Sequence, residues 1–94
     1  MTTEVESPPD DTPIVNLPVV YWRPMCGFCA RLLGALEQAE IAVELRDIWD
    51  DPKAAAFVRS VNDGAETVPT VVLPDGRTVT NPPPEALISH LTGR

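Results

Sequence analysis

The stretch "VYWRPMCGFCARLL", residues 20–33, contains both cysteines of the chain, Cys26 and Cys29, two residues apart. Its apolar and aromatic start predicts a buried strand, which Pro24 breaks. After the break, apolar residues recur with the period of an amphipathic helix, which we expect over about residues 27–40. The recurring positions are Cys29, Leu32, Leu33 and Leu36. Cys26 is therefore expected at the turn from a strand into a helix.

The segments that follow this helix alternate between strand and helix patterns. Val43 and Leu45 alternate with charged residues, which predicts a strand with these two side chains facing the core. Asp51 followed by Pro52 predicts the N-cap and first residue of a helix. The apolar stripe of that helix is Ala54, Phe57, Val58 and Val61.

The last third of the chain predicts a hairpin and a final helix. The turn "LPDGR" separates two short strands, because Pro presets φ and Gly accepts a positive φ. Pro is tolerated at the first position of a helix, so we expect the last helix from about Pro84. The expected strands cover residues 17–22, 42–48, 69–73 and 77–80. This order predicts an α/β fold, a four-stranded mixed sheet flanked by three helices.

Charge is unevenly distributed along the 94 residues, which suffice for one small domain. The net charge is −7, and four of the fourteen acidic residues lie within residues 1–16, where no Lys or Arg occurs. These acidic, Pro-rich residues predict a disordered tail over 1–16 and a folded domain over 17–94.

The same composition bears on partners and location. Acidic proteins lack the basic face that nucleic acid or an anionic membrane requires, so we expect neither partner. The N-terminus has no basic and apolar regions of a signal peptide. We therefore expect a cytoplasmic protein, in which a close cysteine pair is more often catalytic or metal-binding than structural.

The two cysteines are predicted to differ in reactivity. The first N–H groups of a helix have no intrahelical partner and stabilise an anion, so a cysteine there has a pKa of about 3.5–7.5. Cys26 is expected there as the attacking thiolate. Cys29, one turn into the apolar stripe, is expected to be buried and to attack a mixed disulfide on Cys26. Arg23 either favours the thiolate or is a solvated loop charge.

Two other uses of a close cysteine pair fit the sequence less well. A structural zinc site takes four ligands, usually Cys or His. The chain has two cysteines and one histidine, His90, which we expect to be solvated or favoured by the dipole in the last turn of a helix. We therefore predict no metal site. An inert buried pair is the other alternative.

A second element, "ETVPTVV" (residues 66–72), is expected beside Cys26, because the loop before the third strand lies at the end of the first. Pro69 is either an edge proline or part of a cis bond. A cis Val68–Pro69 bond would leave the backbone N–H and C=O of Val68 to pair with an extended thiol substrate.

"VYWRPMCGFC" (20–29) and "AAAFVRSVNDGAETVPTVVLPDGRTVTNPPPEAL" (54–87) resemble glutaredoxin-like proteins of the thioredoxin fold, the mycoredoxins in particular. The resemblance covers roughly residues 17–92. Trp22 and Met25 stand where small or polar residues are usual in this family.

The resemblance implies a thiol–disulfide oxidoreductase that removes mycothiol, a low-molecular-weight thiol of certain bacteria, from mycothiolated proteins. Cys26 would take mycothiol as a mixed disulfide, a second mycothiol would regenerate it, and Cys29 would act only in a dithiol branch. Mycothiol would be a co-substrate rather than a bound cofactor, mycothione reductase an indirect partner, and the protein a monomer. Implied thiol contacts are Arg23, Phe28, Thr67, Val68, Pro69, Thr80 and Asn81, although an aromatic such as Phe28 also serves packing.

Two rival functions use the same fold. An NrdH-type redoxin would carry electrons from thioredoxin reductase to ribonucleotide reductase. An iron–sulfur glutaredoxin would hold a cluster between two chains, and CGFC differs from its CGFS motif only in the last residue. The chain lacks the Trp-Pro-Thr stretch that such proteins have at the position of TVPT.

Overall fold

The computed structural model describes residues 17–93, and the tail predicted over residues 1–16 lies outside them. In chain order the elements are β1 (Val19–Trp22), α2 (Gly27–Gln38), β2 (Glu44–Asp47), α3 (Pro52–Val61), β3 (Thr70–Val72), β4 (Thr78–Thr80) and α4 (Pro84–Thr92). The predicted class, an α/β fold with a four-stranded mixed sheet and three helices, is confirmed.

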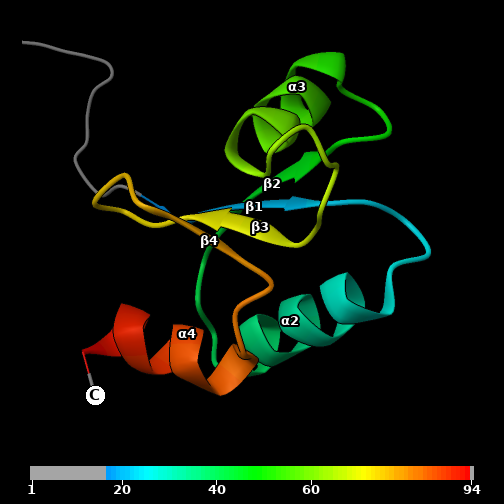
Figure 1. Cartoon of the computed structure of the whole chain (residues 1–94). Helices are drawn as coiled ribbons and strands as arrows, with labels where there is room; N and C mark the ends of the chain where they lie inside the picture. Colours follow the sequence, from blue (N-terminus) through cyan, green and yellow to red (C-terminus); the bar gives the residue numbers. More distant parts are fainter. Residues whose placement is uncertain (1–16, 94) are drawn as a thin grey trace, which may run out of the picture.

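The sheet has the strand order β2-β1-β3-β4. β1 runs parallel to β2 and antiparallel to β3, and β3 pairs with β4 in a hairpin. α3 covers one face, whereas α2 and α4 lie together against the other (Figure 1). Because Tyr21 pairs with Thr70, the residues after β1 and those before β3 meet at the same end of the sheet.

The core has one hydrophobic cluster on each side of the sheet. The cluster under α2 and α4 contains Val20, Leu32, Leu36, Val71, Leu73 and Leu87. The cluster on the α3 side contains Cys29, Ile48, Ala54, Ala55, Val58 and Val68. Cys29 therefore connects α2 to the second cluster, and its place in the core follows from the apolar stripe.

α2 ends at Gln38, two residues before the predicted end. Glu40 adopts a positive φ of 58°, and its N–H donates to the carbonyl of Glu37. The next N–H, that of Ile41, donates to the carbonyl of Leu36 at 3.0 Å. These two bonds form a Schellman motif, here with Glu instead of the usual Gly at the left-handed position.

The prediction that Leu45 and Val61 face the core is wrong. Leu45 is 50% exposed, because β2 is an edge strand with β1 on one side only. Val61 is also exposed, since it is the last residue of α3 and lies at the end of the helix. The predicted start of this helix is confirmed, because the Asp51 carboxylate accepts a hydrogen bond from the N–H of Lys53 at 3.0 Å.

Across residues 17–93, no helix combines the length and the hydrophobicity that crossing a membrane requires.

Candidate active site

Cys26 is the N-cap residue of α2. Its backbone is extended, with φ −118° and ψ 110°, and its Sγ accepts a hydrogen bond from the N–H of Cys29 at 3.3 Å. Met25, with a positive φ of 61°, turns the chain from β1 into the helix. The sulfur therefore occupies the position that a Ser or Asp oxygen usually holds at a helix N-terminus.

The pKa of the Cys26 thiol lies below its ordinary value of 9.0. Burial, the largest single cause, raises this pKa, whereas hydrogen bonds from the thiol and the N–H of Cys29 lower it. The positive charge of Arg23 and the N–H of Phe28 lower it further. The site therefore favours the thiolate, which is the nucleophilic form of cysteine.

Cys29 has the opposite environment. It is 1% exposed, and burial together with the hydrogen bond to Cys26 raises its pKa to about 11. At neutral pH Cys29 is thus a protonated donor next to an ionisable Cys26. The predicted asymmetry of the pair is present in the structure.

Arg23 is held in the loop before α2. Its guanidinium donates to the carbonyls of Pro24 and Met25 at 3.0 and 3.2 Å. Its Cζ also lies 5.2 Å from the ring centre of Trp49, in cation–π geometry. These contacts fix the positive charge close to Cys26, which is the first of the two alternatives that the sequence left open.

The Val68–Pro69 peptide bond is cis. The carbonyl oxygen of Val68 lies 3.9 Å from Sγ of Cys26, which donates to it in the thiol form. Within residues 17–93 the N–H of Val68 has no hydrogen-bond partner. The loop therefore presents a backbone donor and acceptor next to the sulfur, as predicted for a cis bond.

Asn62 is a residue that the sequence pattern marks only as a helix stop. Its side-chain amide donates to the carbonyl of Val58 at 2.9 Å and to Oγ1 of Thr70 at 3.2 Å, and its Oδ1 accepts from Oγ1 of Thr80 at 2.8 Å. Oγ1 of Thr70 in turn donates to the carbonyl of Thr67 at 2.7 Å. Asn62 thus ties the end of α3 to both strands beside the cis bond. Its position at the end of a helix is the only local signal of this role.

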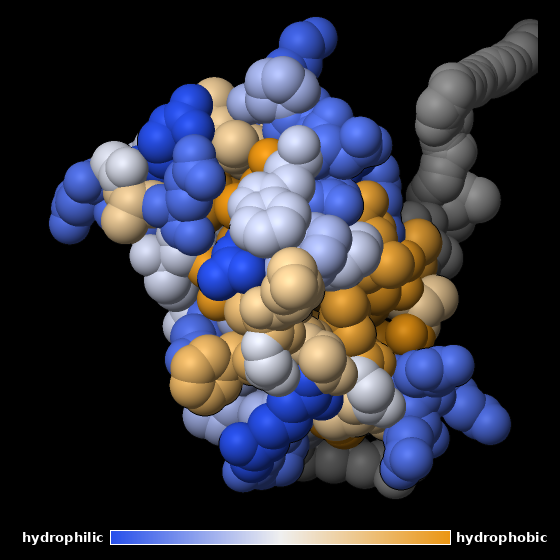
Figure 2. Space-filling view, turned by 90° about the vertical axis from the view of Figure 1, so that its right-hand side faces the viewer, coloured by the Kyte–Doolittle hydropathy of each residue, from blue (hydrophilic) through white to orange (hydrophobic). Residues whose placement is uncertain are grey.

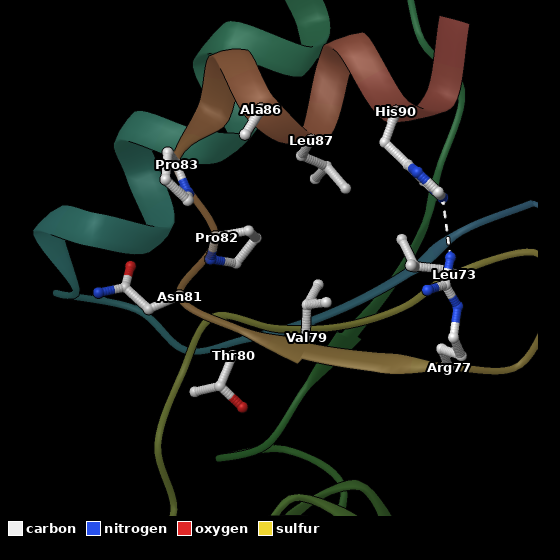
Figure 3. A pocket seen from close by; sticks show the side chains of 10 residues that line it. All are labelled: Leu73, Arg77, Val79, Thr80, Asn81, Pro82, Pro83, Ala86, Leu87 and His90. Atoms are coloured by element: carbon white, nitrogen blue, oxygen red, sulfur yellow. Dashed lines mark hydrogen bonds between the residues drawn. The ribbon is translucent and has the colours of Figure 1, made fainter. Parts of the chain in front are cut away.

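Thr80 and Asn81 lie at the end of β4 and differ in orientation. The hydroxyl of Thr80 is bonded to Asn62, and Figure 3 shows its side chain pointing away from the space between β4 and α4. The N–H of Asn81 donates to the carbonyl of Pro69 at 2.7 Å. Asn81 therefore adjoins the cis loop directly, whereas Thr80 supports it from the α3 side.

A hollow of about 220 Å³ lies between the start of α2 and the segment before α4. Phe28 and Arg31 line it on α2, and Asn81 and Glu85 line it on the opposite side. Phe28 is 63% exposed, so it serves as a wall of this hollow more than as core packing. The hollow combines an aromatic ring with polar groups, an arrangement suited to a small polar ligand.

A larger hollow of about 520 Å³ lies between β4 and α4 (Figure 3). His90 and Arg77 stand at one end of it, with Nε2 of His90 3.5 Å from the guanidinium of Arg77. His90 is exposed in the last turn of α4, as predicted. Neither cysteine lines this hollow.

The described part of the chain contains no group of three or more His, Cys, Asp or Glu side chains that could hold a metal ion.

Known proteins are similar to this chain in sequence. The glutaredoxin family model matches residues 19–79. A Mycobacterium tuberculosis protein named as a glutaredoxin is 49% identical over 63 residues, 67% of this chain and 75% of that protein. Mycoredoxin 1 of Corynebacterium glutamicum is 41% identical over 63 residues, 67% of this chain and 77% of that protein.

Solved structures share the fold. The crystal structure of the thioredoxin-like protein BC3987 has a TM-score of 0.64 and 30% identity, covering 74% of this chain and 93% of that one. A glutaredoxin from Archaeoglobus fulgidus has a TM-score of 0.66 and 24% identity, covering 84% and 87%.

Proposed function

The chain belongs to the glutaredoxin family, and we propose that it reduces mixed disulfides between mycothiol and protein thiols through Cys26. The observation that carries the proposal is the N-cap position of Cys26, where two hydrogen bonds from Cys29 favour the thiolate. The similarity to mycoredoxin 1 supports mycothiol as the small thiol.

The first step is attack by the Cys26 thiolate on the mycothiol sulfur of the mixed disulfide. The bond between that sulfur and the protein sulfur breaks, and the protein leaves as a thiolate that takes a proton. Cys26 is then joined to mycothiol by a disulfide. The lowered pKa of Cys26 supports this step, because it favours the thiolate more than the pKa of an ordinary cysteine would.

The second step returns Cys26 to its reduced form. The thiolate of a second mycothiol attacks the mycothiol sulfur on Cys26, and the oxidised mycothiol dimer leaves. Cys29 competes only if it loses its proton, and its burial, which raises its pKa, opposes this loss. The one-thiol cycle is therefore favoured over the dithiol branch, and mycothione reductase would reduce the released dimer.

The thiol-binding groups that we propose surround the sulfur. The N–H and C=O of Val68 would pair with the cysteinyl part of mycothiol, with Thr67 and Pro69 shaping the loop. Phe28 and Asn81 would contact the remainder in the hollow beside α2. Arg23 acts through its charge on Cys26, and Thr80 acts through Asn62.

We propose that the protein acts as a monomer, with mycothiolated proteins as its partners. A free thiol pair also suits the reducing cytoplasm, where we propose that the protein acts.

The experiment that tests the proposal offers the purified protein two reducing systems. One contains mycothiol and mycothione reductase, and the other contains NADPH and thioredoxin reductase. A mycothiolated protein serves as substrate for the first system, and a dithiol-reducible disulfide serves for the second. We expect turnover with mycothiol. Turnover only with thioredoxin reductase would replace the proposal with the NrdH-type alternative.

A further inference from the structure

A third hollow, of about 430 Å³, opens beside Cys26. It lies between the loop that follows β1 and the first half of α2, and its lining includes Trp22, Met25, Ala30 and Leu33. The loop belongs to the side of the molecule that Figure 2 shows, where hydrophobic side chains gather across the middle with charged ones around them. Met25 at its rim is 90% exposed, and apolar groups left in solvent beside a reactive group mark an interaction site.

The surface of this hollow is almost entirely apolar. Arg23 is the one charged residue among those that line it. Nη1 of its guanidinium donates to the carbonyls of Pro24 and Met25, and the guanidinium packs on Trp49, so the loop and the Trp49 ring hold this charge in place. An apolar hollow of this size fits an aliphatic side chain rather than a sugar or a carboxylate.

The hollow is distinct from the one assigned above to mycothiol. Phe28 and Arg31 line that polar hollow, whereas Ala30 and Leu33 line the apolar one. With 3.6 residues per turn, these two pairs project from opposite sides of α2. Cys26 is the N-cap residue of the same helix, and it lines the apolar hollow but not the polar one.

We propose that the apolar hollow receives an aliphatic side chain of the protein substrate, one or two residues from its mycothiolated cysteine. The inference rests on the proposed function and names a substrate class for it. An extended chain advances about 3.3–3.6 Å per residue, so a residue next to a cysteine whose mixed disulfide lies against Cys26 can reach a hollow that Cys26 itself lines. Protein substrates would then be recognised in the apolar hollow, and mycothiol in the polar hollow.

The test uses three synthetic peptides as mixed disulfides with mycothiol: Gly-Gly-Cys-Gly-Gly, Gly-Leu-Cys-Gly-Gly and Gly-Gly-Cys-Leu-Gly. We expect kcat/KM for at least one leucine peptide to exceed that for the all-glycine peptide by about tenfold, from burial of the leucine side chain. Ala30→Leu places a larger apolar side chain in the hollow, and the ratio of leucine to glycine rates within this variant should fall toward one.

Gln38→Leu is the matched control, since it adds the same side chain at an exposed position of α2 that does not line the hollow. It should keep the wild-type ratio. Equal rates for the three peptides with the wild-type protein overturn the inference and leave the mycothiol proposal standing. The inference is also overturned if sedimentation shows that the wild-type protein is a dimer and that Ala30→Leu dissociates it, because a second copy would then cover the hollow.

A further set of peptides shows whether the mycothiol proposal fails while the inference about the hollow stands. The same three peptides are prepared as mixed disulfides with glutathione. A leucine preference with these peptides, without turnover of the mycothiol forms, overturns the choice of mycothiol and supports the hollow.

Discussion

Sγ of Cys26 lies 3.9 Å from the carbonyl oxygen of Val68, although 42 residues separate the two in the chain. The contact joins the start of α2 to the cis loop before β3. In the thiol form Cys26 donates to this carbonyl, whereas the thiolate cannot. Ionisation of Cys26 therefore frees the Val68 carbonyl for a substrate, and the N–H of Val68 is already without a partner among residues 17–93.

The two single-cysteine variants should behave differently. Cys26→Ser should abolish reduction of a mycothiolated protein, because the attacking sulfur is gone. Cys29→Ser should keep substantial activity with mycothiol as reductant, since a second mycothiol completes the cycle. Steady-state rates with mycothione reductase measure both. An inactive Cys29→Ser protein that remains folded would rule out the one-thiol cycle.

Arg23→Gln should raise the pKa of Cys26, because the positive charge that lowers it is removed. The thiolate absorbance in the ultraviolet, followed against pH in the reduced protein, should move to higher pH. The rising limb of kcat/KM should move with it. Lys53→Gln is the control, since it removes a positive charge on α3 that does not act on Cys26, and its titration should match that of the wild type.

The raised pKa of Cys29 predicts a loss of stability at high pH. The folded protein holds this proton more tightly than the unfolded chain, so the stabilisation is complete below pH 9 and is lost as the pH rises through about 11. The loss should be on the order of 2 kcal/mol. Urea unfolding of the reduced wild type and of Cys29→Ala across this range should give free energies that converge. A constant difference would contradict the assignment.

Asn62→Ala should destabilise the protein by about 1–3 kcal/mol, because the buried hydroxyl of Thr70, the Val58 carbonyl and the hydroxyl of Thr80 each lose a hydrogen bond. We expect KM for the mycothiolated substrate to rise more than kcat falls, since the loop at Pro69 loses its support and the sulfur keeps its environment. Ser60→Ala removes one hydrogen bond within the same helix, to the Phe57 carbonyl, and should leave KM unchanged.

Phe28→Ala should raise KM for mycothiol several-fold without altering the pKa of Cys26, because only the N–H of Phe28 acts on that pKa. The free energy of unfolding of Phe28→Ala should differ from that of the wild type by no more than about 0.5 kcal/mol, as is usual for an exposed position. Phe28→Tyr keeps the ring and should keep KM. A loss of activity in Phe28→Ala that comes with unfolding would mean that the ring serves packing.

The sequence predicted the elements well where neighbouring residues decide them. Asp51 and Pro52 began α3, and Pro84 began α4, because N-cap and first-turn preferences are local. The end of α2 was missed because Glu40 takes a left-handed conformation that its residue type does not favour. Leu45 was misassigned because alternation within a strand does not reveal whether that strand lies at an edge.

The chemistry of the cysteine pair was determined by the sequence, because Cys26 and Cys29 lie within one helical turn and their environments follow from the start of α2. The tertiary structure alone decided the cis bond at Pro69 and the hydrogen bonds from Asn62 to Thr70 and Thr80. Each of these depends on how segments distant in the chain pack against one another, and no pattern of neighbouring residues carries that information.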